Sequence, residues 1–139
     1  MPDTIREVMT PSPHTLDAGA SVQEAARVMS DNDIGDVIVC DGENVCGIVT
    51  DRDITIRVVA QGKDPASTKL GDICSKELTT ISPDDLVDDA VRLMRTKAIR
   101  RVPVVEDGKP VGVVSIGDLA IDLDRQSALA DISTAPPNS

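Results

Sequence analysis

The sequence predicts an α+β fold, an α/β sandwich in which two β-α-β-β-α repeats pack together in pseudo-two-fold symmetry. Residues 15–54 align with residues 80–119 without a gap at a shift of 65, and eleven of the forty paired positions are identical. An internal match of this length indicates a tandem duplication. Each copy alternates helical and β-branched segments, and one copy alone is too small to bury both faces of its sheet. Two copies packed together solve that problem.

Each copy begins with a short extended piece, around Thr15-Leu16 in the first and from Thr79 to Ser82 in the second. An amphipathic helix follows, from Ser21 to Asp31 and from Leu86 to Lys97. Apolar residues in both segments recur near the i, i+3, i+4, i+7 spacing that gives a helix one apolar face. The pattern therefore predicts one helix packed on the sheet in each copy.

Two β-branched runs come next, and turn-forming residues join them into a predicted hairpin. The first hairpin comprises residues 37–40 and 45–50, and the second comprises residues 102–105 and 110–115. A second helix is predicted from Asp51 to Gln61 and from Ile116 to about Asp124. These segments complete the β-α-β-β-α unit.

The duplication divides the chain into a first repeat (1–62), a second repeat (63–125) and a C-terminal tail (126–139). Gly62 and Pro65 indicate a linker within residues 61–67. The tail ends in Pro136-Pro137-Asn138-Ser139, and its composition predicts partial disorder.

Composition excludes several classes of partner. The net charge of −10 disfavours nucleic acid and anionic membrane, since binding either depends on basic side chains that neutralise phosphates. The chain has no Phe, Trp or Tyr on which single-stranded bases could stack. No apolar run approaches the roughly 20 residues of a bilayer span, and the first residues lack a basic region followed by an apolar stretch. A cytoplasmic location is therefore expected.

The three cysteines and the single histidine do not form a metal pattern. Cys40, Cys46, Cys74 and His14 lack the spacings of a zinc site. Cys40 and Cys46 flank the first predicted turn, so a cross-strand redox pair is one interpretation. Small apolar filler is the other, and Val105 at the position equivalent to Cys40 favours it.

The chemistry-bearing pattern is a hydroxyl residue followed three positions later by Asp, at the end of the third strand of each copy. The pairs are Thr50 with Asp53 and Ser115 with Asp118. One interpretation is a capping box, which satisfies the free N–H groups of a helix start. The other is a ligand site, because a helix N-terminus attracts phosphate oxygens and a carboxylate can accept both hydroxyls of a ribose. The two interpretations are compatible.

Three segments together resemble the CBS domain family, whose paired repeats are called Bateman modules. They are Ile99-Arg100-Arg101-Val102-Pro103-Val104-Val105, Gly112-Val113-Val114-Ser115-Ile116-Gly117-Asp118 and Gly47-Ile48-Val49-Thr50-Asp51-Arg52-Asp53. The leading pieces Val8-Met9-Thr10 and Ile73-Cys74-Ser75, with Thr80-Ile81-Ser82-Pro83, fit the opening segment of that family. The resemblance covers roughly residues 5 to 122, and its strength lies in the order of the segments, doubled at constant spacing.

The resemblance implies a regulatory module that binds an adenine nucleotide or adenosyl compound in two clefts between the repeats. AMP, ADP, ATP and S-adenosylmethionine are the implied candidate ligands, and no cofactor is required. Asp and hydroxyl residues would hold the ribose and phosphate, strand backbone would recognise the adenine edge, and basic residues would bind phosphate. The implied nucleotide-binding residues are Thr15, Val37, Val39, Thr50, Asp53, Thr80, Arg100, Arg101, Val102, Pro103, Val104, Ser115 and Asp118.

The two copies differ at one position that affects phosphate binding. At the shift of 65, Arg101 corresponds to Asp36, and Arg100 corresponds to Gly35. Asp36 would repel a phosphate where Arg101 would attract one. One cleft is therefore expected to bind a phosphorylated ligand well, and the other weakly or not at all.

No catalytic constellation is found in the sequence, so the chain is not expected to be an enzyme. His14 lies between Pro13 and Thr15 in a predicted loop and has no Cys or Ser partner that the sequence indicates. The alternative to a ligand sensor is a structural or protein-interaction module without a nucleotide ligand. The resemblance implies a homodimer in either case, and the regulated protein is unknown.

Overall fold

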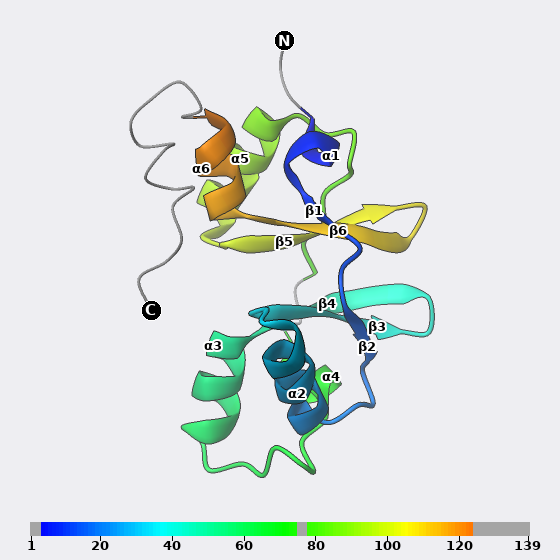
Figure 1. Cartoon of the computed structure of the whole chain (residues 1–139), viewed down its shortest axis with the longest axis vertical. Coiled ribbons are helices and arrows are strands. Elements are labelled where there is room, and N and C mark those ends of the chain that lie inside the picture. The colour runs from blue at the N-terminus through cyan, green and yellow to red at the C-terminus, as the bar shows by residue number, and fades with distance from the viewer. Residues whose placement is uncertain (1–3, 75–77, 124–139) are drawn as a thin grey trace.

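In the computed structural model, which describes residues 4–74 and 78–123, two small sheets face each other and helices cover their outer faces (Figure 1). One sheet has the strand order β2-β3-β4, and the other has the order β1-β6-β5. The strands are β1 (Thr10–Pro11), β2 (Thr15–Asp17), β3 (Asp36–Asp41), β4 (Asn44–Thr50), β5 (Arg101–Glu106) and β6 (Lys109–Ser115). The helices are α1 (Ile5–Val8), α2 (Val22–Asn32), α3 (Asp51–Ile54), η1 (Thr55–Val59), α4 (Leu70–Ile73), α5 (Val87–Lys97) and α6 (Ile116–Leu123). The predicted α+β fold is confirmed.

The helices α2 and α5 confirm the two predicted amphipathic helices to within one residue. The buried positions of the two helices follow the same spacing: Val22, Ala25 and Met29 in α2, and Val87, Ala90 and Met94 in α5. The Ser21 hydroxyl caps α2 by accepting the backbone N–H of Glu24 at 3.1 Å. Both helices end at a residue in the left-handed region, Asp33 with φ 53° and Ala98 with φ 55°. The duplication thus extends to the C-terminal ends of the two helices, whereas at the N-terminus of α5 Leu86 provides no side-chain cap.

The two predicted hairpins are present and carry the same irregularity. Strand β3 pairs antiparallel with β4, and β5 pairs antiparallel with β6. Each ladder shifts register between its fourth and fifth residues, at Val39/Cys40 and at Val104/Val105. A bulge bends and twists its strand, so the two sheets share one curvature.

The helix that follows each hairpin differs between the halves. In the first half, α3 continues into η1, a π-helical turn, whereas in the second half α6 is a single α-helix of eight residues. The predicted end of the second helix near residue 124 and the predicted tail at 126–139 lie outside the described residues. Within residues 4–74 and 78–123, no helix combines the length and apolarity that crossing a bilayer requires.

The segment that leads into each repeat packs on the opposite repeat. Helix α1 and strand β1 join the second half: β1 pairs with β6, and Ile5 is fully buried among core residues between 81 and 119. Helix α4 joins the first half, where Leu70 and Ile73 are buried with core residues between 22 and 58. The hydrogen bonds repeat at the shift of 65, because the N–H of Ile5 donates to Asp85 O and that of Leu70 to Ala20 O, both at 2.9 Å. This exchange of α1 and α4 between the halves was not predicted from the sequence. The predicted boundary between the repeats at residue 62 stays a prediction.

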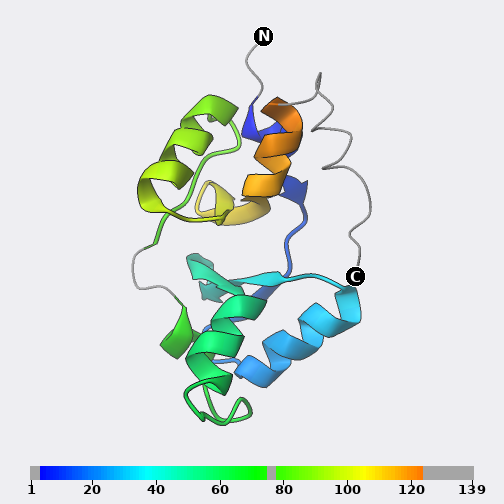
Figure 2. The same cartoon turned by 90° about the vertical axis from the view of Figure 1, so that its left-hand side faces the viewer.

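The two sheets meet through one face of each hairpin. Side chains alternate along β3, so Val37 and Val39 pack toward the helices while Ile38 and Cys40 point toward the other sheet. The inter-sheet cluster consists of Ile38, Cys40, Val45 and Val113, with Ile48 and Val105 packed against it. Turned by 90°, the structure shows helices of the two halves on opposite sides of the paired sheets (Figure 2). This apolar layer holds the halves together.

Cys40 and Cys46 do not face each other. Cys40 lies in the inter-sheet cluster and is opposite Val45 in the ladder, whereas Cys46 packs against the helix-side core of the first half. All three cysteines are free thiols, and burial raises the pKa of Cys40 and of Cys74. A buried thiol with a raised pKa is a poor nucleophile. The structure thus favours small apolar filler over a cross-strand redox pair.

The segment exchange predicts that Ile5→Ala and Leu70→Ala are strongly destabilising, although both residues belong to four-residue helices. Each side chain is completely buried, and truncating a buried Ile or Leu to Ala costs about 2–5 kcal/mol of unfolding free energy. Urea denaturation followed by far-ultraviolet circular dichroism measures the change. Leu78→Ala is the control, because Leu78 is 48% exposed. If Ile5→Ala cost no more than this control, α1 would not be part of the second core.

Candidate functional site

The two hydroxyl–Asp pairs form capping boxes. The backbone N–H of Asp53 donates to Thr50 Oγ1 at 3.1 Å, and the N–H of Thr50 donates to Asp53 Oδ2 at 2.9 Å. Ser115 and Asp118 make the same two bonds at 3.1 and 3.0 Å. In both boxes only Oδ2 of the carboxylate is used by the cap. Each Asp therefore retains a second acceptor oxygen, as a site for a ribose hydroxyl requires.

Beside these boxes, the first residues of β3 and β5 contact each other across the two halves. In the ladders Asp36 pairs with Thr50, and Arg101 pairs with Ser115. The guanidinium of Arg101 crosses to the other half, where Nη1 donates to Gly35 O at 2.8 Å and Nε lies 3.6 Å from Asp36 Oδ2. We call this contact the Arg101 clasp, which comprises Arg101, Gly35 and Asp36.

Gly35 permits the clasp because it has no side chain. A Cβ atom at position 35 would lie 3.2 Å from Nη1 and 3.3 Å from Nη2 of Arg101. The guanidinium thus lies directly on the backbone of the first half. Gly35 and Arg100 are related by the shift of 65, as are Asp36 and Arg101. The ion pair of the clasp therefore joins residues that are equivalent in the duplication.

The clasp corrects one expectation from the sequence. Arg101 and Asp36 were expected to mark two different clefts, one attractive and one repulsive for phosphate. They form a single ion pair, with side chains that are 34% and 25% exposed. Because the two halves meet at these strand starts, equivalent residues come together instead of lying at separate sites. The charge of Arg101 is partly neutralised by Asp36 before any ligand arrives.

Carboxylates surround the clasp. Burial raises the pKa of Asp36 above its ordinary value, and the nearby charges of Asp51 and Asp118 raise it further. Arg101 and His14 act in the opposite direction. The net direction is upward, so the cost of burying the charge exceeds the attraction of Arg101. The region between the two boxes therefore holds three carboxylates around one guanidinium.

The remaining predicted residues lie in and beside the strands. The side chains of Val37, Val39, Val102 and Val104 are completely buried, and Pro103 is buried too. Only backbone groups of these residues could contact a ligand. Part of that backbone is already paired, because Ile38 N–H donates to His14 O and Ile81 N–H donates to Pro103 O. Thr15, Thr80 and Arg100 are exposed.

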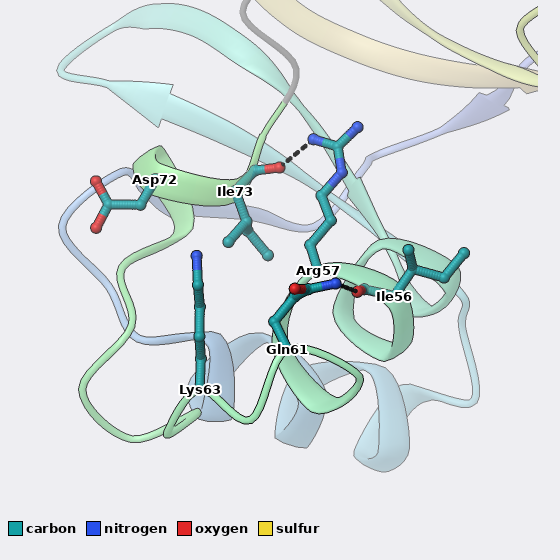
Figure 3. A pocket seen from close by; sticks show the side chains of 6 residues that line it. All are labelled: Ile56, Arg57, Gln61, Lys63, Asp72 and Ile73. Carbon is teal, nitrogen blue, oxygen red and sulfur yellow. Dashed lines mark hydrogen bonds between the residues drawn. The ribbon is translucent and has the colours of Figure 1, made fainter.

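One pocket of about 360 Å³ lies elsewhere, between η1 and α4 on the first half (Figure 3). Its lining residues are Ile56, Arg57, Gln61, Lys63, Asp72 and Ile73. None of the residues predicted to bind the nucleotide lines it. The predicted site is therefore located by the hydrogen bonds of the boxes and the clasp, and not by this open pocket.

Arg57 connects the pocket to the first box and was not predicted from the sequence. Its Nε lies 4.0 Å from Asp53 Oδ1, and its Nη1 donates to Ile73 O at 2.6 Å. A cation four residues after an acid on a helix is a recognisable signal, since positions i and i+4 share one face. That spacing could have identified Arg57.

Comparisons with known proteins agree with this architecture. The model of the family described as "CBS domain" matches residues 5–60 and 70–124. The CBS domain-containing protein YhcV of Bacillus subtilis is 35% identical over 134 residues, which cover 94% of this chain and 95% of that protein.

Two of the solved structures that match this chain illustrate the shared fold. The CBS domain pair of protein MJ0100, in complex with 5′-methylthioadenosine and S-adenosyl-L-methionine, is 25% identical with a TM-score of 0.81, covering 91% of this chain and 100% of that one. Hypoxic Response Protein I with two coordinated zinc ions is 28% identical with a TM-score of 0.75, covering 85% and 97% of the two chains. Among the residues that our structure describes, no group of three or more His, Cys, Asp or Glu side chains could hold a metal ion.

The raised pKa of Asp36 predicts how its removal changes stability with pH. A carboxyl whose folded-state pKa is raised contributes stability below its ordinary pKa, and that contribution is lost as pH rises through the raised value. Asp36→Asn should therefore be more stable than the wild type at pH 7, by up to about 1 kcal/mol. The difference should shrink as pH falls from the raised pKa of Asp36 toward about 4 and be absent below that pH, because the carboxyl is then neutral in both the folded and the unfolded wild type.

Urea denaturation between about pH 3 and about pH 7, which spans the titration of carboxyl groups, measures this difference. The matched control is Asp41→Asn, at the exposed other end of β3. A variant that is less stable than the wild type at pH 7 would show that the attraction of Arg101 exceeds the cost of burying Asp36.

Proposed function

The chain belongs to the CBS domain family and carries two copies of that domain, and from this premise we propose that it is a regulatory, non-enzymatic module that binds an adenosyl ligand. The ligand class comprises AMP, ADP, ATP and S-adenosylmethionine. Binding would take place between the two repeats and pass a signal to a separate protein. That protein is unknown, and a cytoplasmic location stays a prediction.

The observation that carries the proposal is the pair of capping boxes, each with one unused carboxylate oxygen. A cap needs one oxygen, and both boxes use Oδ2 alone. Asp118 Oδ1 has no hydrogen-bond partner among the described residues, and Asp53 Oδ1 has only Arg57 at 4.0 Å. A ribose presents two adjacent hydroxyl donors, which suit a carboxylate already fixed by its helix. The solved pair that contains methylthioadenosine and S-adenosylmethionine supports this ligand class.

Each predicted residue has a role in the proposed site. Asp53 and Asp118 accept ribose hydroxyls, while Thr50 and Ser115 lie at the helix starts beside them. Exposed Thr15 and Thr80 line the approach, at the first extended segment of each repeat. Because the side chains of residues 37–39 and 102–104 are buried, these strands would contribute only backbone groups to adenine. Arg100 and Arg101 are the basic residues that precede the second hairpin and its box.

A phosphate that binds Arg101 would compete with Asp36 for the guanidinium. A phosphate at Arg101 must replace Asp36 as the counter-ion, in a region that already contains Asp51 and Asp118. Charge-assisted bonds from Arg to phosphate are strong and often bidentate, so the exchange is feasible. A neutral or cationic adenosyl group needs no such exchange. The clasp therefore favours ligands with little negative charge close to Arg101.

A second candidate function is protein interaction through the helices, which a set of exposed apolar side chains favours. Ile56 on η1 is 44% exposed, Val59 on η1 is 64% exposed, and Ile116 at the start of α6 is 46% exposed. Exposed apolar side chains on helices of both repeats are typical of contact surfaces. A homodimer formed through these helices would be compatible with ligand binding or could replace it.

Ligand binding is tested by thermal shift against AMP, ADP, ATP and S-adenosylmethionine. A ligand present at about 100 times its Kd should add about 2.7 kcal/mol to the unfolding free energy. Asp53→Asn and Asp118→Asn keep one oxygen for the cap but lose the second carboxylate oxygen, so they should retain the melting temperature of the free protein and lose the shift. Asp41→Asn, at the far end of β3 from the boxes, is the control.

A second measurement uses the composition of the chain. Without Trp or Tyr the protein should absorb very little at 280 nm. A band at 260 nm that survives nuclease treatment and desalting would indicate a co-purified nucleotide. If all four ligands gave no shift and this band were absent, the adenosyl-binding proposal would be wrong and the interaction module would remain.

The homodimer predicts a concentration-dependent mass in solution. Val59→Lys and Ile116→Lys place a charge on an exposed apolar position, and a buried charge in an interface is costly. Light scattering after size exclusion should show a dimer for the wild type and a monomer for at least one variant. The control variant is Lys109→Glu, at the exposed end of β6, and it should remain dimeric. A monomeric wild type at all concentrations contradicts the prediction.

A further inference from the structure

Arg57 distinguishes the first repeat from the second. It lies four residues after Asp53, and the equivalent position after Asp118 is occupied by Asp122. The two boxes are otherwise alike in their bonds and distances. The sequence thus has a cation four residues after the first box and an acid four residues after the second.

The Arg57 guanidinium is held in place on one side and open on the other. Its Nη1 donates to Ile73 O at 2.6 Å, and Nε faces Asp53 Oδ1 at 4.0 Å. Among the described residues, Nη2 has no hydrogen-bond partner, and the side chain is 49% exposed. A guanidinium that is already positioned loses less entropy on binding an anion than a freely rotating one.

The space beside Arg57 has the size and the charge for a small anionic group. The pocket holds about 360 Å³, near the lower end of the volumes of ligand sites. Lys63 extends toward Ile73 from the loop that follows η1, while Gln61 turns back to donate to Ile56 O at 3.5 Å (Figure 3). Two cations and a single acid, Asp72, line the pocket, in a chain whose net charge is −10. Asp53 lies beside Arg57 at 4.0 Å, so Lys63 and Nη2 of Arg57 are the donors that the pocket offers to an anion.

We propose that Arg57 and Lys63 form an oxyanion subsite for the phosphate chain of a nucleotide whose ribose is held by Asp53. The proposal rests on the proposed function for its ribose contact, and it adds specificity for a di- or triphosphate. The subsite belongs to the first half of the structure, and the sequence has no basic residue at position 122, which is equivalent to Arg57. Phosphate selectivity thus comes from Arg57, whereas Arg101 is engaged by Asp36.

The geometry explains why Arg57 suits this task. A long side chain on a helix points toward the helix N-terminus, so Arg57 reaches back to the box in which Asp53 is fixed. The carboxylate and the guanidinium therefore lie side by side, the first an acceptor for the sugar hydroxyls and the second a donor for phosphate. Lys63 supplies a second donor farther along the pocket.

Isothermal titration with adenosine, ADP and inorganic pyrophosphate tests the subsite. In the wild type, ADP should bind at least about tenfold more tightly than adenosine, as charge-assisted bonds to phosphate predict. This ratio should fall as salt rises, since the subsite is open to solvent. Lys63→Ala and Arg57→Gln should each lower the ratio by about three- to tenfold. Lys109→Ala, on the second hairpin, is the control and should keep the wild-type ratio.

The outcomes separate this inference from the proposed function. If adenosine binds and ADP binds no more tightly, or if Lys63→Ala keeps the wild-type ratio, the subsite is wrong and the adenosyl site stands. If neither adenosine nor ADP binds, the proposed function is decided by the thermal shift with S-adenosylmethionine, and pyrophosphate decides the subsite. Pyrophosphate binding that Lys63→Ala weakens supports the subsite, whereas no binding, or binding that this variant leaves unchanged, overturns it. Lys63 is exposed, so this variant tests the inference even if Arg57→Gln does not fold.

Discussion

The structure depends on the burial of one apolar face of each three-stranded sheet. A sheet of this size has helices on only one side, and its other face would be exposed in an isolated repeat. The inter-sheet cluster around Ile38 and Val113 covers both faces at once. The exchanged helices α1 and α4 add a second tie, because each fills the core of the repeat to which it does not belong in sequence. Neither half can complete its core without the other, so the contact between them is a permanent feature of the fold.

The sequence was sufficient for every element that repeats a strong local pattern. The shift of 65, the spacing of Val22, Ala25 and Met29, and the β-branched runs around each turn predicted the helices and hairpins to within a residue or two. The exchange of α1 and α4 was not predictable in this way, because four residues are too few to show a helical period. Tertiary contacts decide which core such a short helix joins. In the structure, the hydrogen bonds from Ile5 and Leu70 show which core each helix joins.

The capping boxes of the candidate site were predictable from the sequence, whereas the partners of Arg101 were not. The box pattern indicated both the cap and an acidic acceptor, and the structure shows the cap with one oxygen unused. The Arg101 clasp could not be predicted from the internal alignment. The alignment places Arg101 and Asp36 at equivalent positions of different repeats, whereas the fold brings the two side chains into contact. Equivalent residues meet at a pseudo-two-fold axis, and a single substitution in one copy there creates a complementary pair instead of two like charges.

Duplication followed by divergence thus has different consequences at that axis and away from it. At the axis, Asp36 and Arg101 neutralise each other, which joins the halves and weakens either residue as a ligand contact. The same exchange of Arg for Asp recurs between positions 57 and 122, but Arg57 makes its contacts to Asp53 and to Ile73, within the first half. A ligand that carries phosphate would meet an excess of carboxylates around Arg101 at the centre of the module, and Arg57 and Lys63 in the pocket near Asp53. Under the proposed function, affinity would depend on the boxes, whereas selectivity would depend on positions that the symmetry keeps apart.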